Sequence, residues 1–252
     1  MDPRTVDLDA LNSATKYPSI PTYHVLDPKN GGLLEETVAF SGEVVLSEKV
    51  DGTNARIILF PGGGYILGSR EELLYARGDL IGNPALGIVD ALRGAADRLT
   101  PPEAGLRVYY LEVYGGKVTG ASKEYTGSRA VGHRLFDVAE VDADVLAWPR
   151  PRISAWREDG GQAFLPEDEL VAAAEKEGFE RVPRLGSIDA AELPAGIAGM
   201  QEFLAELLPA TRAALDDGAG GRPEGVVLRT PDRSAIAKAR FQDYRRTLKR
   251  RR

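Results

Sequence analysis

The sequence predicts an α+β fold in which antiparallel sheets are flanked by helices. Short runs of β-branched and apolar residues, bounded by turn residues, recur along the 252 residues, and a few longer segments with helical periodicity lie between them. Hydrophobic residues make up 43% of the chain and charged residues 28%, which is ordinary for a globular protein. A chain of this length can bury its own core, and we expect residues 1–252 to form one domain.

Seven short segments are predicted strands because each is apolar or β-branched and ends at a turn. They are residues 43–46, 55–60, 65–68, 107–113, 133–138, 225–229 and 235–239. Residues 47–54, between the first two segments, are polar and contain an Asp-Gly pair, so we expect a turn there. Glycines at 62–64 and at 115–116 mark two further turns.

Three segments are predicted helices from the spacing of their apolar residues. Residues 166–178 have an acidic first turn and a final glycine, which are typical start and stop signals. Residues 197–215 are amphipathic, and the glycine-rich residues 216–222 after them predict a loop. The segment 83–98 has one apolar face, formed by Leu86, Ile88, Val89, Leu92 and Ala96.

The composition excludes several classes of protein. The chain has no cysteine, so it has no disulfide framework, thiolate metal site or cysteine nucleophile. Residues 1–10 are polar and partly acidic, unlike a secretory leader, and no apolar run is long enough to span a membrane. We therefore expect a cytoplasmic protein with no membrane partner.

Charge is unevenly distributed along the chain. The formal net charge of −6, taken alone, argues against nucleic-acid binding, since phosphate backbones attract basic surfaces. Residues 239–252, however, contain seven basic residues and one acidic residue, Asp243. The simplest interpretation of this basic tail, residues 240–252, is a solvated, frayed terminus, above all for its last four residues; the alternative is a segment that contacts nucleic-acid phosphates. The second interpretation predicts that deleting residues 247–252 weakens binding of a nucleic acid.

Four separated clusters combine charged residues with predicted strand ends and turns. Singly they are weak signals, because a lone K-x-D-G is more often a surface turn and a lone E-G-V-V-L is usually a plain strand. Their order and combination are much more specific. The clusters are Glu48-Lys49-Val50-Asp51-Gly52-Thr53-Asn54, Glu112-Val113-Tyr114-Gly115-Gly116, Glu224-Gly225-Val226-Val227-Leu228 and Ile236-Ala237-Lys238-Ala239-Arg240.

The residue types in these clusters suit phosphoryl transfer. A lysine in a turn can act as a nucleophile where nearby cations or a bound metal favour its neutral amine. A second lysine and an arginine can hold a triphosphate and neutralise its charge. A carboxylate such as Glu224 can hold a divalent metal, which prefers oxygen ligands.

The set resembles the covalent nucleotidyltransferases, the superfamily of polynucleotide ligases and mRNA capping enzymes. Lys49-Val50-Asp51-Gly52 is similar to their nucleophile motif, and the extension to Thr53-Asn54 is typical of RNA ligases related to the phage enzyme that seals nicks in duplex RNA. Three further segments resemble that family, so the resemblance covers about residues 16 to 246. These segments are Lys16-Tyr17-Pro18-Ser19-Ile20, Ser69-Arg70 and Phe136-Asp137-Val138.

The resemblance implies the nucleotidyltransferase fold of a ligase adenylation domain and an ATP-dependent RNA ligase. In the implied reaction, Lys49 attacks the α-phosphate of ATP, releases pyrophosphate and holds AMP covalently. The AMP then moves to a 5′-phosphate end, and a 3′-hydroxyl attacks that activated end. Mg²⁺ or Mn²⁺, organised by Glu224, would assist by neutralising charge. The implied partners are RNA ends, in a nicked duplex or a broken RNA, and we expect a monomer.

The resemblance also implies roles for other residues. Glu112 would contact the ribose hydroxyls, and Phe136 and Val227 would pack on the two faces of adenine. Lys238 would contact the α-phosphate. The remaining implied contacts with the nucleotide, its phosphates or the RNA end come from Glu48, Asp51, Gly52, Asn54, Arg70 and Arg240.

Arg240 departs from the family pattern, because many relatives have lysine there; arginine keeps the charge but cannot give up a proton. Asp51 matches the wider superfamily, whereas some nick-sealing relatives have histidine at that position.

Two alternative functions remain. A DNA ligase or capping enzyme usually carries an OB-fold after the last motif, and only about a dozen residues follow Arg240, so we expect no C-terminal OB-fold. A binding protein that has lost catalysis is disfavoured because Lys49, Glu112 and the other charged motif residues occur together.

Overall fold

The computed structural model describes residues 2–84 and 87–251, and the chain forms two compact units. Unit 1 comprises residues 1–19, 52–120 and 131–181, and unit 2 comprises residues 20–51, 121–130 and 182–252. The chain passes from unit 2 to unit 1 between Asp51 and Gly52, inside the first charged cluster. The sequence predicts one domain; the structure has two compact units, each with its own sheet and core, so one large domain stays a prediction.

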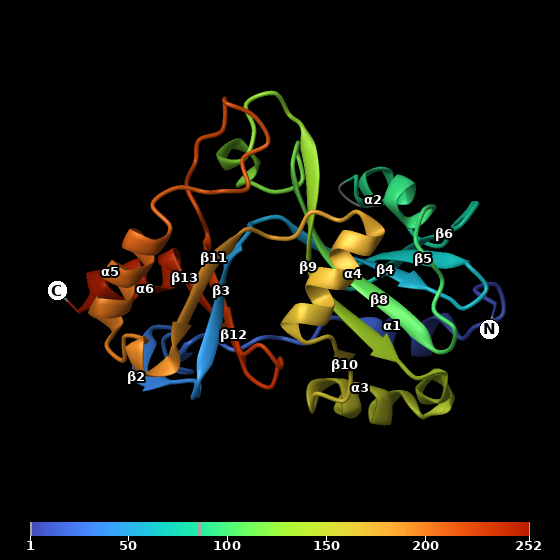
Figure 1. The fold of residues 1–252 in the computed structure, drawn as a ribbon, viewed down its shortest axis with the longest axis horizontal. Coiled ribbons are helices and arrows are strands. Elements are labelled where there is room, and N and C mark those ends of the chain that lie inside the picture. Colours follow the sequence, from blue (N-terminus) through green and yellow to red (C-terminus); the bar gives the residue numbers. More distant parts are fainter. Residues whose placement is uncertain (1, 85–86, 252) are drawn as a thin grey trace. The chain divides into compact units, whose positions relative to one another are not determined.

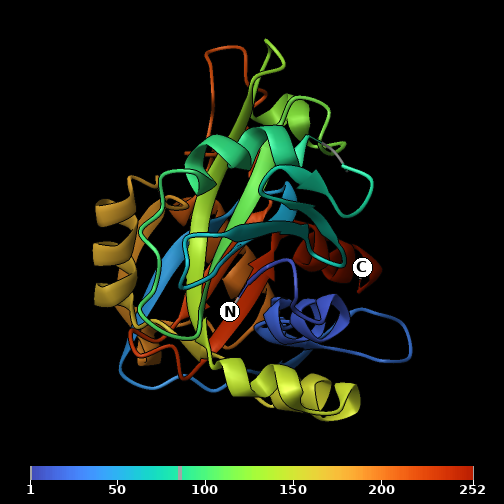
Figure 2. The same ribbon diagram turned by 90° about the vertical axis from the view of Figure 1, so that its right-hand side faces the viewer.

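Unit 1 is built on an antiparallel sheet with the strand order β10-β9-β8-β4-β5-β6-β7 among the described residues. Figure 2 shows its two longest strands, β8 in green and β9 in yellow-green, running side by side. The strands are β4 (Thr53–Leu59), β5 (Tyr65–Ser69), β6 (Leu73–Ala76), β7 (Asp79–Leu80), β8 (Leu106–Gly115), β9 (Val131–Val141) and β10 (Ala163–Phe164).

Helices cover both faces of the unit 1 sheet (Figure 1). On one face, α2 (Ile88–Ala96) and α4 (Glu167–Glu177) pack on alternate residues of the strands. On the other face, α1 (Leu8–Thr15), α3 (Arg150–Glu158) and the short 3-10 helix η2 (Ala143–Ala147) cover the intervening residues. Both faces are apolar for this reason, which explains why the strands are continuous apolar runs and not alternating ones.

Unit 2 is built on an antiparallel sheet with the strand order β11-β3-β12-β13 among the described residues. Two helices, α5 and α6, pack on one face of this sheet and form the core of the unit (Figure 1). The strands are β1 (His24–Leu26), β2 (Leu33–Thr37), β3 (Glu43–Lys49), β11 (Arg184–Asp189), β12 (Gly225–Arg229) and β13 (Ile236–Arg240), and the helices are η1 (Ser122–Glu124), η3 (Ala190–Glu192), α5 (Ile197–Leu207) and α6 (Phe241–Arg250).

The predicted antiparallel strands and flanking helices are confirmed with shifted boundaries, and the structure adds elements that the sequence did not predict: strands β1, β2, β6, β7, β10 and β11 and helices α1, α3 and α6. The helix 166–178 is confirmed as α4, which begins after Pro166 and ends at Gly178, where φ is 72° and glycine is favoured. The helix 197–215 is wrong beyond Leu207, because Pro209 cannot continue a helix. The helix 83–98 begins only at Ile88, and Leu86 lies outside the described residues. None of the described helices is long and apolar enough to cross a membrane.

The frayed-terminus interpretation of the basic tail is wrong for residues 241–250, which are helical, whereas the expected exposure to solvent is confirmed for Lys249, Arg250 and Arg251. Residues 241–250 form α6, and Phe241 and Tyr244 are buried in the core of unit 2. Leu248 packs against the same core, so apolar side chains recur at helical spacing among the basic ones. The charged residues hide this narrow apolar stripe in the sequence. Arg252 lies outside the described residues.

Candidate functional site

One face of the unit 2 sheet carries most of the predicted catalytic residues. Leu46, Leu228 and Ala237 point into the core, so their strand neighbours point to the opposite face. The strand pairing places these neighbours in two rows across β3, β12 and β13: Lys49, Gly225 and Arg240, and then Ser47, Val227 and Lys238.

Lys49 is the last residue of β3, although the sequence predicts a turn from residue 47 to 54. Its Nζ donates a hydrogen bond to Oε2 of Glu224 at 2.7 Å. The side chains are only 24% and 16% exposed, so water screens this ion pair less than it screens a surface pair. Since β3 pairs with β12, and Glu224 immediately precedes β12, the sheet itself brings the two residues together.

Glu224 has the chemistry of a ligand for a hard divalent cation. Burial raises the pKa of its carboxyl group, Lys49 and Arg240 oppose that shift, and the negative charge of Asp51 adds to it. Within the described residues, no group of three or more acidic or histidine side chains could form a metal cage. Mg²⁺ does not need one, because it is usually held by one or two carboxylates together with substrate phosphates and water. Glu224 and Asp51 therefore fit such a cation.

The segment that follows Lys49 is fixed by an aromatic side chain. The backbone N–H of Asp51 donates to the hydroxyl of Tyr125 at 2.7 Å. Tyr125 is 1% exposed, and burial raises the pKa of its phenol well above the ordinary value. The neutral hydroxyl is therefore a permanent hydrogen-bond partner for Asp51. The sequence analysis missed Tyr125, because it lies 74 residues from Asp51 and in none of the charged clusters.

Glu48, which we predict to bind the nucleotide, is buried with an exposure of 1%. Its carboxylate accepts hydrogen bonds from the hydroxyl of Thr211 and, at 2.7 Å, from the N–H of Arg212. It also points away from Lys49, since strand neighbours alternate between the faces. These contacts favour a structural role in holding the loop after α5, and a direct contact with the nucleotide stays a prediction.

Arg240, in the same row as Lys49, is held by Asp243, which in the sequence is only the one acidic residue of the basic tail. Its Nε donates to Oδ2 of Asp243 at 2.7 Å, and Asp243 is 3% exposed. Asp243 also accepts a hydrogen bond from Arg246, at 3.3 Å. The guanidinium of Arg240 is thereby oriented, and the two Nη atoms of this half-buried side chain keep four N–H donors for other partners.

Unit 1 contributes a second group of predicted residues, around Gly52 and Glu112. The N–H of Gly52 donates to Oε1 of Glu112 at 3.0 Å. A side chain at position 52 would collide with the carbonyl oxygen of Val113 and lie 2.8 Å from Cβ of Tyr114. Only glycine fits this approach of β4 to β8, which is a structural reason for the glycine of the K-x-D-G motif.

Asn54 lies directly opposite Glu112 in the pairing of β4 with β8, so the two side chains share a face of the sheet. The Oδ1 atom of Asn54 is buried and accepts no hydrogen bond within the described part of the chain. Because this atom has no exposed surface, a contact between Asn54 and a ligand stays a prediction.

Phe136 occupies a β-bulge in β9. The pairing with β8 shifts between Tyr110, which faces Asp137, and Leu111, which faces Leu135, so Phe136 is the extra residue. Bulges re-aim a side chain and are frequent next to active sites. The ring meets Tyr17 edge-on, with centroids 5.0 Å apart and planes at 90°, and it is only partly buried.

Arg70 follows β5 and is exposed. Its Nη2 atom donates to the hydroxyl of Ser19 at 3.3 Å, and its Nε atom lies 3.6 Å from Oε1 of Glu71. The same glutamate pairs with Lys16 at 2.7 Å. Two segments that the resemblance singles out, residues 16–20 and Ser69-Arg70, therefore meet in unit 1.

A family model described as RNA ligase matches residues 42–249 of this chain. No curated protein matches the chain. The matched residues include all four charged clusters, most of both units, and helix α6 up to Lys249.

Solved RNA ligase structures share the fold. Two forms of an archaeal ATP-dependent RNA ligase have TM-scores of 0.55 and 0.54 at 18% and 19% identity, and each match covers 91% of this chain and 49% of that ligase. A mutant RNA ligase from Naegleria gruberi with ATP and Mn has a TM-score of 0.54 at 15% identity, with 83% of this chain and 52% of that ligase covered. The likeness confirms the predicted ligase fold. The chain spans about half the length of these ligases.

Proposed function

This chain belongs to the RNA ligase family, and we propose on that premise that it is an ATP-dependent RNA ligase with Lys49 as its nucleophile. The observation that carries the proposal is the ion pair between Lys49 and Glu224, on a sheet face that also presents Lys238 and Arg240. A strand-end amine beside a buried carboxylate and two further cations is the arrangement that phosphoryl transfer from a nucleotide requires.

In the proposed first step, Nζ of Lys49 forms a bond to the α-phosphorus of ATP, and the bond from that phosphorus to pyrophosphate breaks. The amine must first leave the ion pair and give up a proton to solvent. Glu224 holds the amine in place before ATP binds, and Glu224 and Asp51 are the residues that would hold a divalent cation. When bound, such a cation neutralises phosphate charge and orients the triphosphate.

Lys238 and Arg240 are proposed to stabilise the charge on the phosphates during this transfer. Both point to the same face as Lys49, and Arg240 lies in its row. In unit 1, the Oε1 atom of Glu112 is a hydrogen-bond acceptor, which suits ribose hydroxyls. Phe136 in unit 1 and Val227 in unit 2 each have a partly exposed apolar surface, of the kind that suits a face of adenine.

The later steps are proposed to move AMP to a 5′-phosphate RNA end and to join that end to a 3′-hydroxyl. The family and the fold support an RNA substrate, and the relatives solved with ATP and Mn support ATP and a divalent metal. Asn54, which shares a face of the unit 1 sheet with Glu112, is our candidate for contact with a terminal hydroxyl. Cytoplasmic location and a monomeric state stay predictions from the sequence.

The proposal is tested by incubating the protein with α-labelled ATP and Mg²⁺. We expect covalent label on the wild type and no label on Lys49→Ala. Lys29→Ala, an exposed lysine of unit 2, is the matched control and should label normally. Equal labelling of Lys49→Ala would overturn the assignment of the nucleophile, and better labelling from GTP than from ATP would favour a capping enzyme. A panel of nicked RNA duplexes, single-stranded RNA and DNA substrates then identifies the joined ends.

A further inference from the structure

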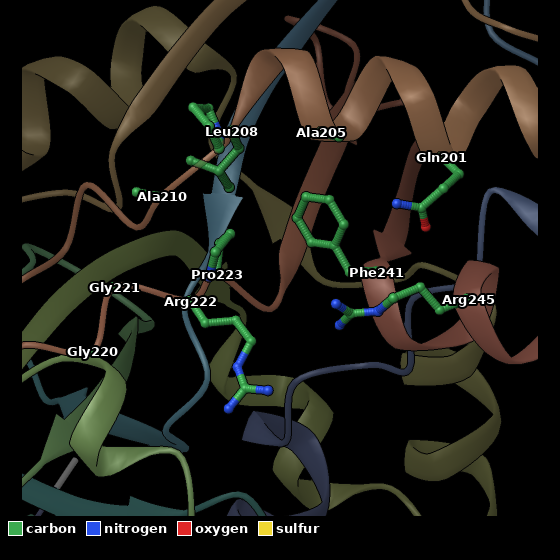
Figure 3. Close-up of a pocket in the computed structure, with 11 residues that line it drawn as sticks. Gln201, Ala205, Leu208, Ala210, Gly220, Gly221, Arg222, Pro223, Phe241 and Arg245 are labelled. Atoms are coloured by element: carbon green, nitrogen blue, oxygen red, sulfur yellow. The ribbon is translucent and has the colours of Figure 1, made fainter.

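Unit 2 contains a pocket of about 550 Å³ between the end of α5, the loop before β12 and the first turns of α6 (Figure 3). Apolar side chains form one side of it, and two arginines reach into it from the loop and from the helix. Its lining includes Leu208, Gly221, Arg222, Pro223, Phe241 and Arg245.

The loop wall of this pocket is held in place by its own hydrogen bonds. Oε1 of Glu124 accepts from Nη2 of Arg222 at 2.7 Å, and Oε2 accepts from its backbone N–H at 3.2 Å. The N–H of Gly221 donates to the carbonyl oxygen of Glu124 at 3.0 Å. Earlier in the same loop, Asp216 accepts a hydrogen bond from the N–H of Gly127 at 2.8 Å. This and other hydrogen bonds hold the pKa of the Asp216 carboxyl well below its usual range. The pocket is therefore formed without a ligand.

Arg245 differs from the other arginines of α6. Arg246 and Arg250 donate to carbonyl oxygens of the turn between β1 and β2, and Arg251 pairs with Glu35. Arg245 is exposed, and its guanidinium makes no hydrogen bond or ion pair within the described part of the chain; its central carbon lies 5.8 Å from the ring centroid of Phe241. Its charge is therefore available to a ligand.

The two guanidiniums extend toward one another below Phe241 in Figure 3. Arg222 shares its charge with Glu124, so the pocket carries a net positive charge close to one unit, which matches one phosphodiester. Planar guanidinium forks bind phosphate oxygens in pairs. Leu208, Pro223 and Phe241 form an apolar wall that suits the adjoining sugar or base.

The pocket also adjoins the end of the sheet where Lys49 lies. Pro223 directly precedes Glu224, and the N–H of Phe241 donates to the carbonyl oxygen of Glu224 at 3.0 Å. An RNA strand bound in the pocket would thus lie next to the backbone at Glu224, which positions the Lys49–Glu224 ion pair.

We propose that this pocket binds a backbone phosphate of the RNA strand, with Arg245 and Arg222 as its two ligands, a proposal that rests on the RNA ligase function proposed above. The pocket accounts for RNA binding by a chain with net charge −6, because it supplies a local basic site. Arg245 belongs to the segment that the sequence analysis treated as a basic tail, and the structure separates it from the arginines that only hold the fold.

The test measures binding of a fluorescent nicked RNA duplex by anisotropy over a range of salt concentrations. Arg245→Ala should weaken binding about five-fold or more at low salt, and it should reduce the slope of log affinity against log salt by about one. The double variant with Arg222→Ala should bind still more weakly but keep a slope reduction of about one, because the pocket binds a single phosphate. Arg245→Lys should keep the slope and lose part of the affinity, since it keeps the charge without the fork.

The matched control is Lys249→Ala, which removes one exposed positive charge from the same helix outside the pocket. If Lys249→Ala weakens RNA binding as much as Arg245→Ala does, the proposal is overturned, because RNA then responds to the overall positive charge of α6 and not to the pocket. An unchanged affinity and slope in Arg245→Ala would also overturn it. If inorganic phosphate or pyrophosphate stabilises the wild type but not Arg245→Ala while RNA affinity is equal, the pocket takes a free anion and not a strand. Labelling of the wild type with ATP tests the proposed function separately, because it needs no RNA.

Discussion

The Nζ atom of Lys49 lies 2.7 Å from Oε2 of Glu224, so the proposed nucleophile and the proposed metal ligand neutralise one another in the protein without nucleotide. Both are mostly buried, and a buried charge that loses its partner is much more costly than an exposed one. The pair therefore couples the stability of unit 2 to the protonation of Glu224.

Lys49→Met should make stability depend on pH. The pKa of Glu224 is already raised above the ordinary value of 4.5 by burial, and Lys49 is its strongest opposing influence. The variant raises that pKa further. A group whose pKa is higher in the folded protein favours folding below the unfolded pKa, and that contribution is lost as the pH rises through the folded pKa. The melting temperature of Lys49→Met should therefore fall further below the wild type at about pH 8 than at about pH 5, with a cost of about 1–3 kcal/mol.

The control for this prediction is Lys29→Met, which removes an exposed lysine and should melt close to the wild type at both pH values. If the difference in melting temperature between Lys49→Met and the wild type stays constant from low to high pH, Glu224 does not form an ion pair with Lys49 in the folded protein.

Glu224→Gln should abolish most adenylation without unfolding the protein. Glutamine keeps the shape and an acceptor for Lys49, so the loss of the ion pair should lower the melting temperature without preventing folding. The loss of a carboxylate that orders a cation should lower the adenylation rate about a hundred-fold or more. Glu36→Gln, at an exposed position of β2, should leave the rate unchanged. A near-normal rate in Glu224→Gln, together with a normal melt, would show that Glu224 is only a strand-end residue.

The sequence predicts the sheet strands of the site because they are short apolar runs, and it predicts the charged clusters because their order is specific. It does not predict which contacts orient them. Tyr125 reaches Asp51 and Thr211 reaches Glu48 from distant loops with no periodic pattern, so only the folded chain brings them together. Helix α6 escapes prediction for another reason: its apolar stripe is narrow, and its basic residues resemble a solvated tail.

Gly52→Ala should destabilise the protein more than an ordinary glycine substitution. The new methyl group would meet the carbonyl of Val113 and lie 2.8 Å from Cβ of Tyr114, and neither backbone nor Cβ atoms can move away cheaply. We expect a loss of about 1–3 kcal/mol in the free energy of unfolding. Gly62→Ala is the matched control, because no atom lies within 4 Å of a methyl group there. Similar melting temperatures for the two variants would contradict the crowding of Gly52.

Deleting residues 247–252 should lower the melting temperature, and it is therefore not a clean test of RNA binding. Thr247 is buried; its hydroxyl accepts from the N–H of Leu33 at 2.9 Å and donates to the carbonyl oxygen of Asp243 at 2.8 Å. Hydrogen bonding to Arg251 lowers the pKa of Glu35, so the end of α6 also holds β2 by charge. The deletion removes both contacts and exposes part of the core. We therefore expect adenylation and sealing to fall together, with about 2–4 kcal/mol of stability lost.

Two point variants are the controls for this deletion. Thr247→Val removes the hydroxyl alone and should cost about 1 kcal/mol, whereas Lys249→Ala should melt like the wild type. A truncated protein with the wild-type melting temperature would mean that the last turn of α6 contributes nothing to the fold.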